Sequence, residues 1–565
     1  MMRDHYRFLM RLFVISALYV CILPNYTVGK TDQAALTLEE VKHILITNRN
    51  FSDKNLSKLD LSEMDLSNAT LANTNLSEAN LHAANLSDTI LIQTNLDNAL
   101  LTEAILNGCK MNHTSLKNAD LRNATLSQIV IYYSDLTNAN MKEADLNGAF
   151  IKESSFSNAN LCEANMSLSY IAADFRSANL KNADLHGATL IDTSLQNSDM
   201  STINLSGAKL LHVNMNDAKL SGSNLSYSVM ILIEMMAADL AGSYLRGVSI
   251  KDSDFSACNL SNINLENASI FKTDFSETDI RYAHLTHSYL EEVTMKGANM
   301  SGIDLQYATA IKSILNDVIL SDADLRGAYL NETILKNANL QNANLYGADL
   351  RYANLSKANL QGVSLTNTNL LNIILMDVDL KKFNLSGLDL SHADLRNADL
   401  TGANFEGAIL KDADLSNANL TEANLNNANL INASLNKALV CNATLVNSNL
   451  SSGDLSNAIM IGADLSNAKL NNAKLNKVNL ERARLKNASM NEANLYCANL
   501  NNAILNSATL TNTNLRNSDL RLADLDNTDL KGADLKGADF TGGKISLIKN
   551  IKQTKNVKRA KGLNN

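Results

Sequence analysis

Large apolar residues recur at every fifth position along almost the whole chain. One series runs from Phe51 to Ile171, and a second runs from Phe175 to Ile545. One residue is missing between the two series, near residues 172–174. A fixed short period over such a length predicts a repeat architecture in which each unit packs on its neighbours, and it argues against a set of separate globular domains.

Each unit combines a short strand pattern with a turn. In Ala343, Asn344 and Leu345 a small apolar, a polar and a large apolar residue alternate, so Ala and Leu are predicted to face inward and Asn outward. A strand that simply continued would place the next large residue, Leu350, on the outer face. The two residues in between must therefore turn a corner. The predicted coil has a narrow interior filled by Leu and Ala, with no room for a substrate.

A second, longer period indicates how many units make one coil. In the second series, apolar residues directly after the large residue are uncommon, and seven of them are separated by multiples of 20 residues. These seven are Ile191, Leu211, Ile231, Phe271, Ile311, Leu371 and Ile431. With four units per coil they stack along one edge of the solenoid, and an exposed apolar row of this kind is typical of a partner surface. The alternative is that these corner residues bury their side chains against one another.

Three irregularities interrupt the repeat. The missing residue near 172–174 predicts a bend or a tightened corner, with a hinge between two rods as the alternative. Ala310 stands where a large residue is expected, and we expect Ile311 and Ile314 to fill the space. In residues 363–388 larger side chains replace Ala, so the core there must widen or repack, unless the segment is specialised as a junction or a contact site.

The repeated unit resembles that of the pentapeptide repeat family. Ala343-Asn344-Leu345 and Ala533-Asp534-Leu535 match the family pattern, and the resemblance covers residues 51–545. Members of this family form a right-handed quadrilateral β-helix. The resemblance therefore implies an all-β solenoid of about 25 coils, each built from four pentapeptide units. These four units agree with the 20-residue period of the apolar residues.

A short helix is predicted in residues 30–50, just before the repeats. Thr37 and Glu40 have the spacing of a capping box at a helix start. Leu38, Val41 and Leu45 follow at helical spacing and predict one apolar face. Because a solenoid has an open end whose core must be covered, we expect this helix to cap the first coil.

Residues 1–29 have the layout of a signal peptide. Three arginines precede an apolar run from Leu12 to Leu23, and the small residues Thr27 and Gly29 follow. The apolar run is short for a membrane span. The sequence therefore predicts an exported protein, periplasmic or secreted, with an uncleaved membrane anchor as the alternative.

The charge of the chain is unevenly distributed. Residues 1–29 carry three Arg and one Asp, and residues 546–565 carry five Lys, one Arg and no acidic residue. Of the 49 basic and 58 acidic residues, 40 and 57 therefore belong to residues 30–545, a net charge of −17. The basic segment 546–565 is interpreted as a cap, a frayed tail or an arm for an anionic surface.

No constellation of catalytic or metal-binding residues stands out. The six cysteines and nine histidines are dispersed, and no Cys-x-x-Cys pair occurs. Asp and Ser are frequent because the repeat places them on its outer faces. We therefore expect no enzyme activity, no cofactor and no metal site.

These features favour an exported, non-catalytic rod that serves as a structural or protein-interaction scaffold. Its partner is an unidentified protein, a second copy of the chain included, and we expect membrane contact only through an uncleaved leader. One alternative follows from the family resemblance, because some members mimic B-form DNA and bind DNA topoisomerases. Another is an effector delivered to a host cell. The leader and the mixed surface charge disfavour the DNA mimic, and direct nucleic-acid binding is not expected.

Overall fold

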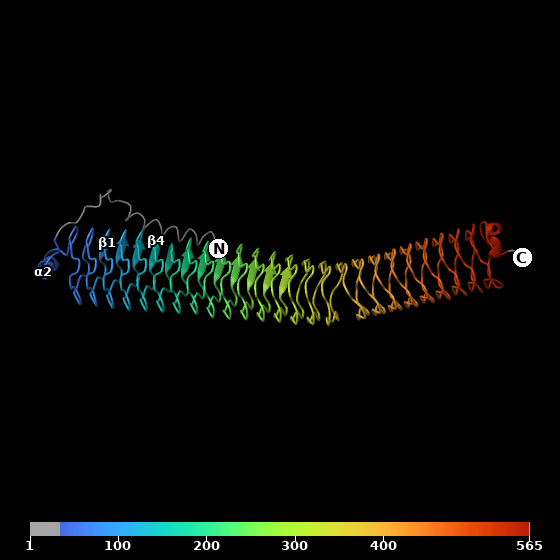
Figure 1. Ribbon diagram of the computed structural model, residues 1–565, viewed down its shortest axis with the longest axis horizontal. Coiled ribbons are helices and arrows are strands. Elements are labelled where there is room, and N and C mark those ends of the chain that lie inside the picture. The colour runs from blue at the N-terminus through green and yellow to red at the C-terminus, as the bar shows by residue number, and fades with distance from the viewer. Residues whose placement is uncertain (1–33, 564–565) are drawn as a thin grey trace.

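The computed structural model describes residues 34–563, which form a long rod of stacked coils (Figure 1). The fold is a mostly-β parallel solenoid with one short α-helix, α2 (Leu38–Thr47), at its N-terminal end. The predicted signal peptide, residues 1–29, lies outside the described residues. Within residues 34–563, no helix has the length and hydropathy that a membrane crossing requires.

Helix α2 begins with the predicted capping box. The side chain of Thr37 accepts a hydrogen bond from the Glu40 N–H, and the Glu40 carboxylate accepts one from the Thr37 N–H at 2.7 Å. Val41 is fully buried, and Ile44 and Leu45 pack against the hydrophobic core. Leu38 was predicted to face the core and is instead 39% exposed. The helix therefore covers the end of the core with a narrower apolar face than the spacing predicts.

The repeating unit turns its corner with a left-handed residue. In the unit around Leu335, the N–H of Ala338 donates to the carbonyl of Leu335 at 3.1 Å and closes a four-residue turn. Asn337, the third residue of this turn, has a φ of 58°. Asn and Gly adopt this left-handed conformation at the least cost, which explains their frequency at this position. Leu335 and Ala338 are both buried, so the turn returns the chain to the core.

The polar residue before each large residue stabilises both its own turn and the stack of coils. The Oδ1 atom of Asn339 accepts from the N–H of Gln341 at 3.2 Å. The same atom accepts from Nδ2 of Asn359 in the next coil at 2.9 Å. Beside this side-chain contact, the N–H of Leu340 donates to the carbonyl of Asn359 at 2.8 Å. An Asn or Asp at this position is therefore part of the fold and does not by itself indicate a functional site.

Neighbouring coils pair in parallel with an offset of 20 residues, as the bridge between Asn50 and Thr70 illustrates. Across the missing residue the offset falls to 19, as between Asn160 and Asn179. Twelve short strands on one side of the rod form a single parallel sheet whose order follows the sequence, which marks about 11 turns. The strands are β1 (Ile90–Ile92), β2 (Lys110–Asn112), β3 (Val130–Tyr132), β4 (Phe150–Ser155), β5 (Tyr170–Asp174), β6 (Thr189–Ile191), β7 (Lys209–Leu211), β8 (Val229–Ile231), β9 (Ser249–Lys251), β10 (Ser269–Phe271), β11 (Tyr289–Glu291) and β12 (Thr309–Ile311).

The missing residue is absorbed at the corner within β4 and β5. Lys152 pairs with Ala172, but the next pair is Ser155 with Asp174, so β4 carries a bulge relative to β5. Glu153 in β4 has a left-handed φ of 50°, whereas β5 runs extended across the corner. The corner is thus straightened, not tightened. Pairing with the following coil continues on both sides of it, so the ladder has no break here.

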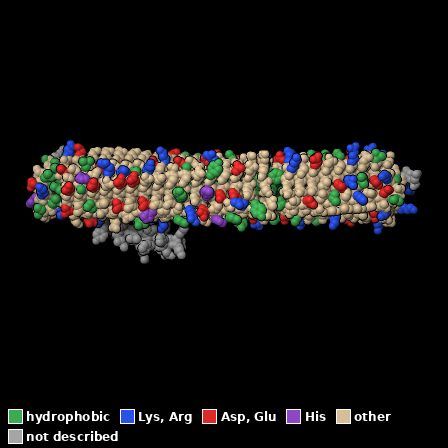
Figure 2. Space-filling view, turned by 90° about the horizontal axis from the view of Figure 1, so that it is seen from below, with side chains coloured by type: hydrophobic (Ala, Val, Ile, Leu, Met, Phe, Trp, Pro, Cys, Tyr) green, Lys and Arg blue, Asp and Glu red, His purple; other side chains and the backbone are tan. Residues whose placement is uncertain are grey.

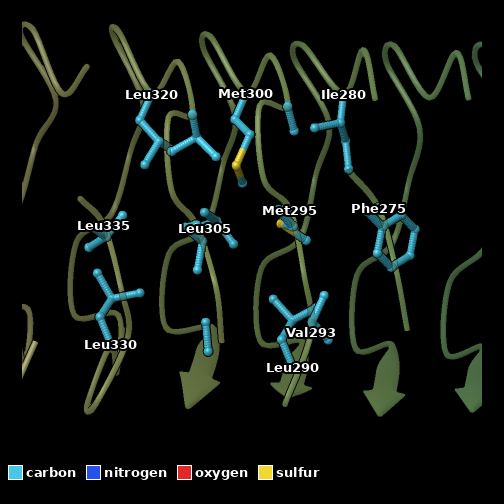
Figure 3. Close-up of a cluster of buried hydrophobic side chains, with 14 of the residues drawn as sticks. Phe275, Ile280, Leu290, Val293, Met295, Met300, Leu305, Leu320, Leu330 and Leu335 are labelled. Carbon is cyan, nitrogen blue, oxygen red and sulfur yellow. The ribbon is translucent and has the colours of Figure 1, made fainter. Parts of the chain in front are cut away.

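Ala310 leaves a small void in the core. Its side chain is buried in β12 beside Leu290 of the preceding coil, and it lines an apolar cavity of about 10 Å³. Figure 3 shows Leu290, Leu305 and Leu330, which line the same cavity. The prediction that Ile311 and Ile314 fill the space is wrong. Ile311 is only half-buried, and Ile314 is 38% exposed. Alternation along a strand explains the error, because a residue next to an inward position must face outward.

Filling this void should stabilise the rod. We expect Ala310→Leu to raise the free energy of unfolding by about 1–2 kcal/mol, because it restores the leucine that stacks at this position in other coils. Urea unfolding followed by circular dichroism measures the change. The matched control is Ala308→Leu, which overfills a fully packed site and should destabilise the protein. A loss of stability in both variants would show that the cavity cannot accept the larger side chain.

The coils separate locally between residues 359 and 389. Ile374 is bridged to Asn354 and to Asp394, but within the described chain no bridge joins residues 359, 364 and 369 to residues 379, 384 and 389. Figure 1 shows a widened space between coils in this region. Large side chains occupy the position that Ala usually holds, and two of them remain partly exposed. These larger residues are Val363, Thr368, Ile373, Val378, Phe383 and Leu388, and the partly exposed two are Phe383 and Leu388.

Amide hydrogen exchange should detect this gap. The N–H groups of Asp379, Asn384 and Asp389 lack the inter-coil bonds that the N–H groups of Asp399, Asn404 and Ile409 make one coil later. We expect the first three amides to exchange at least tenfold faster, because opening them breaks no ladder bond. Exchange followed by mass spectrometry of the two corresponding peptides provides the comparison. Equal protection in both peptides would mean that the ladder is continuous in solution.

Candidate interaction surface

The outer face of the twelve-stranded sheet presents two columns of side chains. In β8, Met230 is fully buried, whereas Val229 and Ile231 on either side of it are only half-buried. The same alternation places the first and third residues of each three-residue strand on the outside. We call this surface, formed by the outward residues of β1–β12, the sheet face.

The structure brings together part of the predicted apolar row. Ile191 pairs with Leu211, and Leu211 pairs with Ile231, so these three side chains stack on successive strands β6, β7 and β8. Lys251 then separates Ile231 from Phe271, and Glu291 separates Phe271 from Ile311. Leu371 and Ile431 lie further along the rod, beyond the last strand of the sheet. All seven predicted residues are half-buried.

Sequence reasoning missed the second column of the sheet face. Its apolar members stand directly before the inward residue, where the repeat normally has Asp or Asn. They are Ile90, Val130, Phe150, Tyr170, Val229 and Tyr289. The ring of Phe150 stacks on Tyr170 at 4.8 Å and lies 5.4 Å from Tyr132. The sequence does contain a signal for this column, because its apolar residues recur with the same 20-residue phase as the predicted row.

One contiguous part of this surface is the apolar patch formed by Ile191, Leu211, Val229 and Ile231. Their backbone is fixed by parallel pairing on both sides, so the patch is rigid before any partner binds. Charged residues mark its C-terminal limit, where Lys251 lies 5.8 Å from the ring centre of Phe271. A rigid apolar patch with a charged margin has the layout of a protein interface.

An open acidic groove borders the apolar patch. It has two neighbouring parts of about 610 Å³ and about 310 Å³, and Leu232 and Glu234 line both. The carboxylates of Asp252, Asp254, Asp274 and Glu292 also line it, together with Lys272. In the part of the chain that the structure describes, no three or more His, Cys, Asp or Glu side chains are arranged to hold a metal ion. The groove therefore adds negative charge along one side of the apolar patch.

Much of the acidity elsewhere on the rod is neutralised within single repeats. In seven units an Asp before the large residue pairs with the Arg that follows it, at distances of 2.6–2.7 Å. The hydrogen bond from Arg122 lowers the pKa of Asp120 below its ordinary value. The seven pairs are Asp120–Arg122, Asp174–Arg176, Asp279–Arg281, Asp324–Arg326, Asp349–Arg351, Asp394–Arg396 and Asp519–Arg521.

The five cysteines in residues 34–563 divide into buried and half-buried thiols. Cys109 and Cys258 replace Ala in the core, and burial raises the pKa of Cys109 to about 11 and that of Cys258 to about 12. Each thiol donates to a backbone carbonyl, Leu86 in the first case and Met235 in the second. Cys162, Cys441 and Cys497 lie on the outer side of the coils and are half-buried.

Thiol labelling should separate these two groups. Because the thiolate is the reactive form, a raised pKa leaves almost no reactive Cys109 or Cys258 at pH 8. We expect Cys441 and Cys497 of the native protein to react with a disulfide reagent at least 100-fold faster than Cys109 and Cys258. Peptide mapping by mass spectrometry identifies the labelled sites, and labelling in denaturant is the control. Fast native labelling of Cys109 would show that its coil opens.

Comparison with known proteins identifies the repeat. A family model described as pentapeptide repeats matches the chain in overlapping segments, from residues 55–91 through 503–542, that together cover most of that range. A search of curated proteins gave no match.

Several solved structures are similar to this chain. HetL, a pentapeptide repeat protein involved in heterocyst differentiation regulation in the cyanobacterium Nostoc sp. strain PCC 7120, is 30% identical over 44% of this chain and 87% of its own, with a TM-score of 0.20. QnrB1, a plasmid-mediated fluoroquinolone resistance protein, is 18% identical over 34% of this chain and 93% of its own, with a TM-score of 0.24. Because these TM-scores are low, the assignment of the repeat rests on the family model.

Proposed function

Because this chain belongs to the pentapeptide repeat family, whose members are typically non-catalytic, we propose that it is an exported, non-catalytic scaffold that binds a protein partner through the apolar patch. We further propose a right-handed, four-sided rod of about 25 coils. Parallel bridges that continue from Asn50 to Lys561 support this count, because 495 residues (51–545) at 20 per coil give about 25 coils.

The observation that carries the proposal is the contiguity of Ile191, Leu211, Val229 and Ile231 on adjacent strands. Most outward positions of the repeat hold polar residues, so an apolar cluster at this place is an exception that the fold does not require. Burying such side chains contributes about 1.5–3 kcal/mol each when a partner covers them completely. Most of the surface of each residue is already covered here, so the remaining gain is smaller, but it is summed over four residues.

The chemistry of the patch indicates what the partner presents. An apolar surface complements the four side chains, and basic side chains beside it complement Glu234 and Asp254 in the bordering groove. The same surface of a second copy of this chain would supply apolar side chains but no basic ones, because its groove is acidic as well. The features therefore favour a different protein over a homodimer.

The DNA-mimic alternative is less well supported by the surface. A mimic of duplex DNA needs closely spaced negative charge that is not compensated nearby. In this rod seven aspartates are paired with an arginine in the same repeat, and lysines and histidines are interspersed (Figure 2). We keep topoisomerase binding as the second candidate, and delivery into a host cell as a third, because both are compatible with a rigid solenoid.

Export is proposed from the signal-like layout of residues 1–29 alone. Cell fractionation followed by N-terminal sequencing of the mature protein tests it. A chain that begins near residue 30 in the exported fraction supports the proposal. An intact leader in the membrane fraction would instead support the uncleaved anchor.

Site-specific cross-linking tests the apolar patch. A photoreactive amino acid at Val229 should give a discrete adduct in cells, because a bound partner lies within a few ångströms of it. We expect Leu211→Asp combined with Ile231→Asp to reduce the adduct at least tenfold. The matched control is Leu439→Asp with Ile459→Asp, a stacked exposed apolar pair outside the sheet, which should leave the adduct unchanged.

Three results would contradict the proposal. The first is the absence of any adduct at Val229, and the second is an equal loss in the control variant. The third is inhibition of DNA supercoiling by the mature protein, which would favour the topoisomerase alternative. An adduct of twice the chain's mass would identify the partner as a second copy of the protein.

A further inference from the structure

The last coil of the rod is built differently from all the others. Lys549, Lys555 and Lys561 follow one another at six-residue spacing, and they bridge to Asp529, Asp534 and Asp539, which are five residues apart. The added residues are taken up by two single 3-10 turns, η1 (Ile551–Gln553) and η2 (Val557–Arg559). The wider last coil thus lies across the end of the solenoid, where the preceding coil would otherwise be open.

Apolar side chains of this coil close the core from the C-terminal side. Ile548, Ile551, Val557 and Leu563 are partly buried and pack against the hydrophobic core. Each also remains partly accessible within the described residues. Leu547 is 55% exposed. The end of the rod is therefore an aliphatic surface, unlike the N-terminal end, which is covered by helix α2.

Basic residues surround this aliphatic surface. The side chains of Lys549, Lys552, Lys555, Lys558, Arg559 and Lys561 are all exposed. Residues 546–563 contain no acidic residue. Among the described residues, the ion pairs of this region involve Arg516, Arg521 and Lys544. Lys561 acts on Asp539 only at longer range, where its charge contributes, after the hydrogen bond from Thr541, to the lowered pKa of that carboxyl. Figure 2 shows Lys and Arg side chains on this end of the rod. Because the basic positions lie on successive sides of one coil, the positive charge surrounds the end instead of forming a stripe along one face.

We propose that the C-terminal end of the rod docks end-on onto an anionic lipid bilayer. Lysines beside an anionic bilayer each strengthen binding by roughly fivefold, and exposed aliphatic side chains enter the boundary between headgroups and acyl chains. Both elements are present here on one rigid end. This proposal is independent of the partner bound at the sheet face and of the leader.

A nucleic acid fits this end less well. Residues 541–563 contain no aromatic side chain on which a base can stack. The apolar residues among the lysines are aliphatic, and they contribute to lipid binding but not to phosphate-backbone binding. The same charge would attract either polyanion, so the experiment includes both.

Vesicle sedimentation with the full chain tests the proposal. We expect binding to vesicles that contain about 30% phosphatidylglycerol, little binding to pure phosphatidylcholine, and loss of binding at high salt. Lys552→Gln, Lys558→Gln and Arg559→Gln together should lower the partition coefficient about 100-fold, because three basic side chains are removed. None of these three residues forms a β-bridge to the preceding coil, and Arg559 contacts Gly537 through its backbone carbonyl only, so the cap should stay folded.

The matched control is Lys469→Gln, Lys477→Gln and Lys486→Gln, which removes the same charge from exposed side chains on the body of the rod. It should bind anionic vesicles as the unmodified chain does. Leu547→Ser should weaken binding a few-fold without changing its salt dependence, because it removes only apolar contact. The leader is common to all variants, so differences between them report on the C-terminal end.

Equal binding of the two triple variants would overturn the proposal, since the effect would then depend on net charge alone. Equal binding of the unmodified chain to neutral and anionic vesicles would also overturn it. Tight binding of duplex DNA with no binding of anionic vesicles would assign the end to a nucleic acid instead.

Discussion

Neighbouring coils of the rod are held together by backbone hydrogen bonds between residues 19 to 21 positions apart, which together give the 20-residue register. The bond from the Leu340 N–H to the Asn359 carbonyl is one rung of this ladder, and the Asn359 to Asn339 side-chain contact is a second rung beside it. Because side chains repeat at the same interval, like residues stack on like. A leucine lies over a leucine in the core, and a carboxylate or amide lies over another on the surface. The effect of a substitution on packing therefore depends on the residues that stand at the same position in the preceding and the following coil.

This dependence explains why substitutions have such different consequences along the chain. Ala310 is tolerated with only a small void, because its backbone rungs to the neighbouring coils remain in place. The larger residues in 363–388 are not absorbed in the same way, because several fall on neighbouring sides of consecutive coils. Their combined volume separates the coils on three sides, and the backbone hydrogen bonds between the coils are absent there. The stack of coils is therefore disturbed less by one side chain that is too small than by several neighbouring side chains that are too large.

The sequence alone predicts the solenoid, the helix at its N-terminal end and the 20-residue register, because these follow from periodicity and from local capping chemistry. It predicts the stacking of Ile191, Leu211 and Ile231 for the same reason. It does not reveal that Leu38 is exposed, since this depends on the angle at which the helix meets the core. The outward direction of Ile314 does follow from alternation, because this residue stands directly before the buried Leu315. The second apolar column, with Val229, stands directly before the inward residue, where the repeat normally holds Asp or Asn, so the spacing of residues that follow the large residue does not predict it. For the C-terminal coil the sequence supports a cap, a frayed tail and an arm for an anionic surface alike, because its six-residue spacing has no counterpart in the repeat.

The gap between residues 359 and 389 has a mechanical consequence. In an ideal solenoid, bending and tension are shared by four rungs per coil, so stiffness is uniform along the axis. Here the connection on one side, through Ile374, must transmit most of the force. Stress applied to the ends would concentrate at this joint, and the rod would flex or yield there before either half deformed. The two halves can in this way change their relative direction while the sheet face and the C-terminal end each keep their own shape.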